Sequence, residues 1–128
     1  MKMPIEIAYE QDGEFVKMTA SGTMTDDDIY DALRQIYGHP DFEKVKFQLA
    51  NYSDVSKYEA SKEATDKIIA LDKQAFERNP YMRVAIVAST FLLFETVRYW
   101  ELSVGHQTVE TNVFQNLEAA EAWLFAED

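Results

Sequence analysis

The stretch Arg83-Val84-Ala85-Ile86-Val87-Ala88-Ser89 decides how the rest of the chain is interpreted. It holds five consecutive apolar residues, and the turn-forming pair Asn79-Pro80 precedes it. A short apolar run bounded by turn signals is typical of a strand that is buried on both faces. We therefore expect a central strand here, with the other elements forming layers around it.

Strand and helix patterns alternate on the N-terminal side of this stretch. The turn at 11–14 joins two alternating runs into an antiparallel hairpin, which Ser21-Gly22 ends. The expected elements are, in order, strands at 5–9 and 15–20, a helix from Thr25 to Tyr37, a strand at 45–49, a polar loop at 50–57 and a helix at 59–78.

A capping signal marks the start of the first helix. Thr25 and Asp28 have the spacing of a capping box, and the triplet Asp26-Asp27-Asp28 suits the positive end of a helix dipole. An acidic triplet also matches a cation site, but capping explains it more simply. In the second helix we expect Ala64, Ile68, Leu71 and Ala75 to be buried. Its predicted solvated face is Glu59, Lys62, Glu63, Asp66, Lys67 and Asp72.

The third helix, at 91–104, is apolar on two sides. One stripe at i, i+4, i+7 and i+11 should face the sheet: Leu93, Val97, Trp100 and Val104. A second side carries Leu92, Tyr99 and Leu102, with Glu95 and Arg98 nearby. Such a side is normally covered. The cover is a second subunit, an apolar ligand or another part of this chain.

The C-terminal part supplies a last strand and a last helix. Gly105-His106-Gln107 turns the chain, the strand at 108–114 alternates like an edge strand, and Asn116 caps a helix from 117 to about 126. The order is therefore ββαβαβαβα. It implies a single α/β domain over residues 1–128 with a mixed, mainly parallel sheet.

Composition narrows the function classes. The chain has 128 residues, a formal net charge of -11 and no cysteine. Strong acidity argues against nucleic acid, whose phosphates are neutralised by Lys and Arg. Without cysteine there are no disulfides or thiolate sites. No apolar run has the length of a membrane span, and no signal-peptide pattern follows Met1, so a cytoplasmic location is expected.

Motifs for catalysis or cofactors are not found in the sequence. His39 and His106 fall in separate turns, and the glycines are scattered rather than gathered in a phosphate loop. We therefore expect no enzymatic activity, no cofactor and no metal.

The sequence resembles the SpoIIAA-like or STAS superfamily, in particular its stand-alone bacterial STAS-like branch, which is also related in fold to CRAL-TRIO domains. Three segments carry the resemblance: Arg83-Val84-Ala85-Ile86-Val87 followed by a helix with Arg98, His39-Pro40-Asp41-Phe42, and Val113-Phe114-Gln115-Asn116-Leu117-Glu118-Ala119-Ala120-Glu121-Ala122-Trp123-Leu124. The resemblance implies the SpoIIAA-like fold. It is a more specific guide to fold than to function.

The resemblance also implies a candidate modification site. Superfamily members carry a phosphorylatable serine in an Asp-Ser-Ser-Gly motif at the start of the second helix. The corresponding residues here are Glu59-Ala60-Ser61-Lys62, which place Ser61 at the phosphorylated position and lack the glycine.

The expected function is protein–protein interaction or regulation, through a homodimer or another protein. The candidate face is Leu92, Glu95, Arg98, Tyr99 and Leu102, since tyrosine and arginine are enriched at interface hot spots. The alternative is a carrier or sensor of a small apolar, lipid-like ligand in a pocket beside the third helix.

Overall fold

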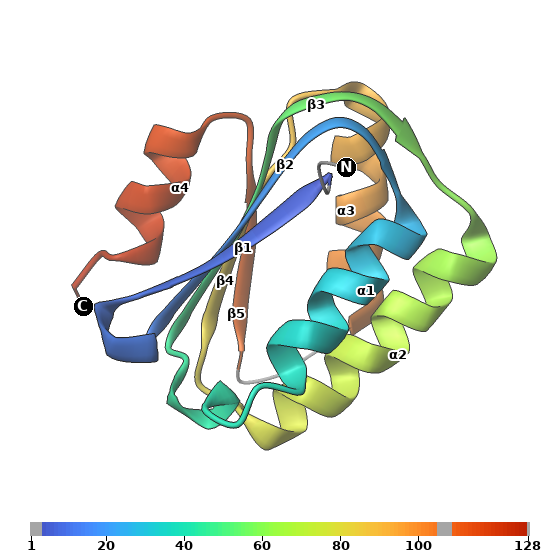
Figure 1. The fold of residues 1–128 in the computed structure, drawn as a ribbon. Coiled ribbons are helices and arrows are strands. Elements are labelled where there is room, and N and C mark those ends of the chain that lie inside the picture. Colours follow the sequence, from blue (N-terminus) through green and yellow to red (C-terminus); the bar gives the residue numbers. More distant parts are fainter. Residues whose placement is uncertain (1–3, 105–108, 128) are drawn as a thin grey trace.

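A single mixed sheet organises the computed structural model, which describes residues 4–104 and 109–127. Its strands lie side by side in chain order (Figure 1): β1 (Ile5–Glu10), β2 (Phe15–Thr25), β3 (Phe47–Glu59), β4 (Arg83–Val87) and β5 (Glu110–Phe114). β1 is antiparallel to β2, and the remaining neighbours are parallel. The predicted order ββαβαβαβα and the mainly parallel sheet are confirmed.

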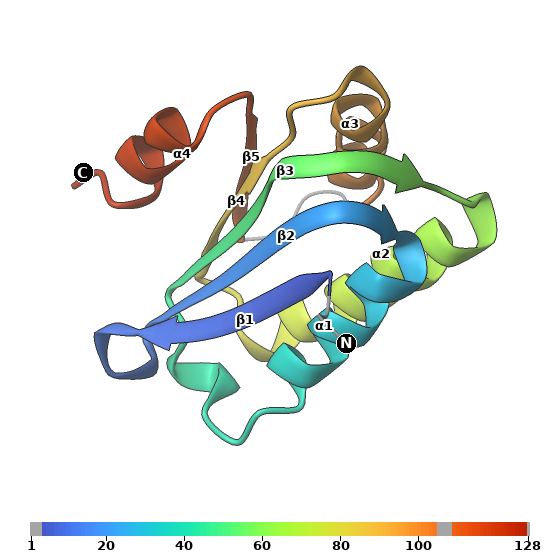
Figure 2. The ribbon, with the colours of Figure 1, turned by 45° about the horizontal axis from the view of Figure 1, so that its top comes forward.

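Helices cover both faces of the sheet. α1 (Asp26–Tyr37), α2 (Lys62–Arg78) and α3 (Phe91–Val104) lie on one face, and α4 (Leu117–Leu124) lies on the other (Figures 1 and 2). Two apolar cores result, a large one beneath α1–α3 and a smaller one beneath α4. β4 contributes to both, because Val84 and Ile86 face the large core while Ala85 and Val87 face the small one. The central strand is therefore buried on both faces, as predicted.

The N-terminal hairpin and the first helix cap are also confirmed. β1 and β2 are joined through a short 3₁₀ turn at Gln11–Gly13. The Thr25 hydroxyl accepts a hydrogen bond from the Asp28 amide at 3.1 Å, and the Thr25 amide donates to the Asp28 carboxylate at 2.9 Å. This reciprocal pair is the capping box that starts α1.

Two strands are longer than the sequence predicts. β2 does not end at Ser21-Gly22 but continues to Thr25, and Gly22 adopts φ +72° between two register shifts of the β2–β3 ladder. The predicted polar loop at 50–57 belongs to β3, which pairs with β2 along its whole length but with β4 only as far as Asn51. Figure 2 shows β2 and β3 curving together toward the starts of α1 and α2.

The second helix begins later than predicted, and of its predicted buried residues Ile68 and Ala75 are buried whereas Ala64 and Leu71 are half-buried. Glu59 ends β3, and α2 starts at Lys62 after the N-cap Ser61. Asp72, assigned to the solvated face, is only 2% exposed, so that assignment is wrong. It is buried because Tyr37 and Trp100 donate hydrogen bonds to its carboxylate. The buried residues of α2 are Thr65, Ile68, Ile69, Asp72, Ala75 and Phe76.

The C-terminal elements match the prediction with shifted bounds. β5 is an edge strand, as expected, and spans Glu110–Phe114 in the described part of the chain. The predicted turn Gly105-His106-Gln107 and Thr108 lie outside the described residues. α4 ends at Leu124 rather than near Ala126. Across the described part of the chain, no helix combines the length and apolar character that a membrane crossing requires.

Candidate functional site

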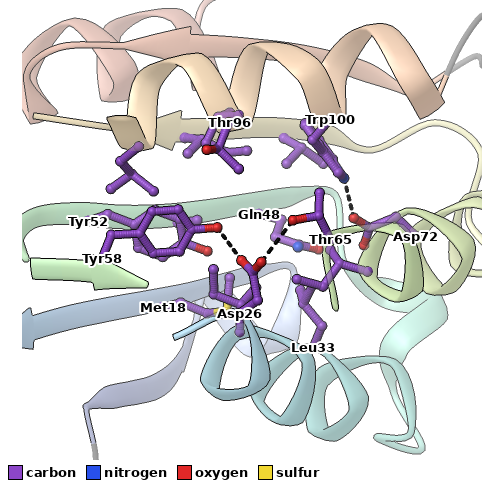
Figure 3. A pocket seen from close by; sticks show the side chains of 17 residues that line it. Met18, Asp26, Leu33, Gln48, Tyr52, Tyr58, Thr65, Asp72, Thr96 and Trp100 are labelled. Atoms are coloured by element: carbon purple, nitrogen blue, oxygen red, sulfur yellow. Dashed lines mark hydrogen bonds between the residues drawn. The ribbon is translucent and has the colours of Figure 1, made fainter. Parts of the chain in front are cut away.

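A cavity of about 60 Å³ lies between the sheet and the helices α1, α2 and α3 (Figure 3). Its walls are mostly apolar, with contributions from α3 through Leu93, Val97 and Trp100. Several polar side chains also face it, among them Asp26, Gln48, Tyr52, Tyr58, Thr65 and Asp72. A mostly apolar pocket with a few convergent polar groups has the composition of a small-molecule site.

Asp26 closes one end of the cavity with three hydrogen bonds. Its buried carboxylate accepts from the Tyr58 hydroxyl, from the Ser61 amide at 3.0 Å and from the Thr65 hydroxyl at 2.8 Å. Burial raises the pKa of Tyr58, and the hydrogen bond to Asp26 adds to this effect. Asp26 therefore joins the first residue of α1 to the end of β3 and the start of α2.

The acidic triplet thus divides into three environments. Asp26 points inward, Asp27 is exposed, and Asp28 completes the capping box. Capping explains Asp28, as predicted, whereas the role of Asp26 was not predicted. Within residues 4–104 and 109–127, no three His, Asp or Glu side chains are grouped so that they would hold a metal ion.

Asp72 links the three helices above the sheet. Its carboxylate accepts from the Tyr37 hydroxyl of α1 and from Nε1 of Trp100 on α3, both at 2.5 Å. Burial raises the pKa of Asp72 to about 7, and the two hydrogen bonds oppose this rise. Tyr37 has a pKa well above its ordinary value because it is buried and because Asp72 is negatively charged.

Gln48 also lines this cavity and carries an unpaired polar atom. It lies on β3 between Val16 of β2 and Val84 of β4, and it is 3% exposed. Its Nε2 donates a long hydrogen bond of 3.5 Å to the Tyr37 hydroxyl. Its Oε1 is buried and has no hydrogen-bond partner among the described residues. A buried, unpaired amide oxygen costs about 1–3 kcal/mol of stability.

The predicted second side of α3 is exposed. Leu92 is 52% exposed, Tyr99 44% and Leu102 76%, and Glu95 and Arg98 are exposed beside them. Arg98 lies 4.0 Å from Glu101, and the Tyr99 hydroxyl is 3.4 Å from the Asp66 carboxylate. These residues share one surface, and the described part of the chain does not bury them. Of the three covers that the sequence leaves open, the described residues therefore do not provide the intramolecular one.

Ser61 lies close to that surface. Its hydroxyl accepts from the Ala64 amide at 3.1 Å, so it is the N-cap of α2. Ser61 also lines a shallow groove between α2 and α3, together with Glu95 and Tyr99. Thr65 and Thr96 line both this groove and the cavity, so the two spaces lie next to each other.

His39 is not among the residues that line the cavity or the groove. The Nδ1 atom of His39 accepts from the Asp41 amide at 3.0 Å, and its ring lies against Tyr9. His106 lies outside the described residues.

Comparison with known proteins identifies the family. The chain belongs to the SpoIIAA-like family, whose profile matches residues 15–125. One similar solved structure is an uncharacterised protein of the DUF3478 family with a SpoIIAA-like fold, from Shewanella loihica PV-4. It is 20% identical, with a TM-score of 0.58 over 94% of this chain and 91% of that chain.

A second similar structure is the anti-sigma factor antagonist SpoIIAA in its unphosphorylated form. It is 10% identical, with a TM-score of 0.61 over 93% of this chain and 94% of that chain. At these identities the likeness concerns the fold, and it confirms the fold expected from the sequence. No curated protein matches the sequence.

Asp72 offers a test of the buried site through its pKa. The folded state holds a proton on Asp72 up to about pH 7, whereas the unfolded chain releases it near 3.8. The contribution of Asp72 to the unfolding free energy is therefore present below pH 4 and lost as the pH rises to 7. The Asp72→Asn variant does not titrate at this position and should lack this loss. Between pH 4 and pH 7 its unfolding free energy should therefore rise by on the order of 4 kcal/mol relative to that of the parent. Urea unfolding across this pH range measures the difference.

The exposed Glu77 on the same helix provides the control, because Glu77→Gln should follow the parent at every pH. A constant difference between Asp72→Asn and the parent would show that Asp72 ionises normally in the folded protein.

Gln48 offers a second test. Gln48→Met keeps the length of the side chain and removes the unpaired oxygen, so we expect the unfolding free energy to rise by about 1–2 kcal/mol. Urea unfolding at one pH measures it, with exposed Gln35→Met on α1 as the matched control near zero. A destabilised Gln48→Met variant would show that the amide oxygen has a stabilising partner in solution.

Proposed function

We propose that this SpoIIAA-like domain is a non-catalytic, cytoplasmic protein-interaction module that pairs with a second copy of itself through the outer side of α3. The observation that carries the proposal is the exposure of Leu92, Tyr99 and Leu102 along one helix. Large apolar side chains gathered on one exposed surface are typical of interaction sites. The similar structure described as an anti-sigma factor antagonist supports this function class, because its name denotes action on a protein.

The spacing of the face suits pairing between two copies. Leu92, Glu95, Tyr99 and Leu102 follow one another at intervals of three, four and three residues, which form a single stripe along a helix. An antiparallel, two-fold arrangement centred between Glu95 and Tyr99 sets Leu92 against the partner's Leu102. The same arrangement brings Glu95 beside the partner's Arg98. In this arrangement the face is therefore complementary to itself in the placement of its leucines and of its charges.

Replacing Leu92 and Leu102 with lysine should convert the dimer to a monomer while the domain stays folded. The two leucines are exposed, so their loss creates no cavity, but four lysines would meet at the two-fold interface. Light scattering measures the mass in solution, and circular dichroism checks the fold. The control Glu118→Gln/Glu121→Gln makes the same change of net charge on the exposed side of α4, and it should remain a dimer.

A charge exchange checks the proposed arrangement. Glu95→Arg and Arg98→Glu should each weaken pairing, because each places like charges side by side, and the double variant should restore it. A parent protein that is monomeric at all accessible concentrations would refute the homodimer.

A carrier role is the second candidate function, and the cavity beside α3 is the observation that favours it. The cavity is smaller than the 150 Å³ that an engineered, benzene-binding cavity provides. A lipid chain therefore does not fit inside it in this conformation, and a carrier would take a much smaller molecule or group.

Ser61 is proposed as the regulatory position of this module. A phosphate there would add a charge of about -2 in the groove that also contains Glu95 and Tyr99. Ser61→Asp should weaken pairing severalfold at low ionic strength and less at high ionic strength, because added salt screens the repulsion. Sedimentation at two salt concentrations measures the dissociation constant.

Ser61→Asn is the matched control, since Asp and Asn are equally good N-cap residues and differ in charge. Equal dissociation constants for the two variants would exclude an electrostatic effect of Ser61 on pairing.

A further inference from the structure

Two buried carboxyl groups face the cavity without a positively charged side chain beside them. Asp26 and Asp72 both face it, and none of the residues that line it is Lys, Arg or His. Tyr52 lies near both carboxyls, whose negative charge adds to burial in raising the pKa of its hydroxyl. A buried carboxylate is normally paired, because removing its charge from water is costly.

Hydrogen-bond acceptors also outnumber donors in the cavity. A carboxylate accepts up to about four hydrogen bonds, whereas Asp26 receives three and Asp72 receives two. Gln48 lines the same cavity, and its buried Oε1 atom receives none from the described residues. These side chains can therefore accept further hydrogen bonds, which matches a ligand that donates them.

Aromatic rings line the cavity as well. Tyr52 and Tyr58 from β3 lie at one end, and Trp100 from α3 lies near Asp72 (Figure 3). Aromatic faces attract organic cations, and the attraction grows when water is excluded. A cation would also favour the charged form of Asp72, whose pKa burial raises to about 7.

The size of the space limits the ligand. About 60 Å³ holds several water molecules or a group of a few heavy atoms. The groove between α2 and α3 lies next to the cavity, with Thr65 and Thr96 lining both, and a longer molecule that passes these two side chains would extend toward Glu95. A compact charged head with an aliphatic tail fits this arrangement.

We propose that the cavity binds the ammonium head of a small aliphatic amine, held between Asp26, Asp72 and the free oxygen of Gln48, with its tail in the groove between α2 and α3. The inference rests on the carrier role and narrows it from an apolar ligand to an organic cation. It does not depend on the pairing of α3.

Calorimetric titration of the dialysed full-length protein with n-butylamine, which is cationic at neutral pH, tests the proposal. The matched probe is 1-butanol, which has the same size and no charge. We expect n-butylamine to bind at least about tenfold more tightly, as one hydrogen bond to a charged group implies. Gln48→Met should weaken its binding about tenfold, Asp72→Asn should weaken it further, and Glu77→Gln should leave it unchanged.

A fluorescence titration locates the ligand. In a Trp123→Phe variant the emission comes from Trp100, which contacts Asp72 in the cavity. We expect n-butylamine to change this emission with the affinity found by calorimetry.

The outcomes separate the inference from the carrier role. If 1-butanol and n-butylamine bind equally well near Trp100, the proposed preference for a cation is refuted and the carrier role stands. If neither binds, both the cation preference and the carrier role are refuted. If Gln48→Met and Asp72→Asn do not change the binding of n-butylamine, the amine binds to the acidic surface rather than in the cavity. This outcome also refutes the inference.

Discussion

The hydrogen bonds of Asp72 fix the arrangement of the three helices above the sheet. Tyr37, Asp72 and Trp100 come from α1, α2 and α3, and each helix contributes one member of the group. Because both donors are bulky aromatic side chains, they set a distance between the helices that apolar packing alone would not specify. Asp72 and Trp100 also line the cavity, so the same contacts that orient the helices also shape the candidate site.

Much of the fold follows from local sequence patterns. The apolar run Arg83–Val87 identifies the central strand because it is buried on both faces, and Thr25 with Asp28 marks the start of α1. The long ends of β2 and β3 were missed for a physical reason. There the β2–β3 ladder continues beyond the last pairing with β4, and polar residues alternate irregularly with buried Tyr52, Val55 and Tyr58. Such a segment has the composition of a loop.

The candidate site was harder to predict from the sequence, because its polar residues resemble ordinary surface residues. Asp72 stands among charged neighbours on α2, and Asp26 belongs to a triplet that capping explains. Gln48 lies two residues after Lys46 in a strand that alternates polar and apolar residues. The partners that bury these side chains lie far away in the sequence: Thr65 is 39 residues from Asp26, and Trp100 is 28 from Asp72. The exposed side of α3, in contrast, was visible as a second apolar stripe on one helix.

The chain order of the strands has a consequence for the way the protein folds during synthesis. Each new strand from β2 to β5 adds next to the one made just before it, so the sheet can grow in the order of translation. The buried carboxyls cannot be enclosed so early. Asp26 can bond to Thr65 only after α2 has been synthesised, and Asp72 can bond to Trp100 only after α3 has been synthesised. Both carboxyls therefore stay hydrated until these helices have left the ribosome. A nascent chain therefore closes its charged interior only after most of its sheet exists.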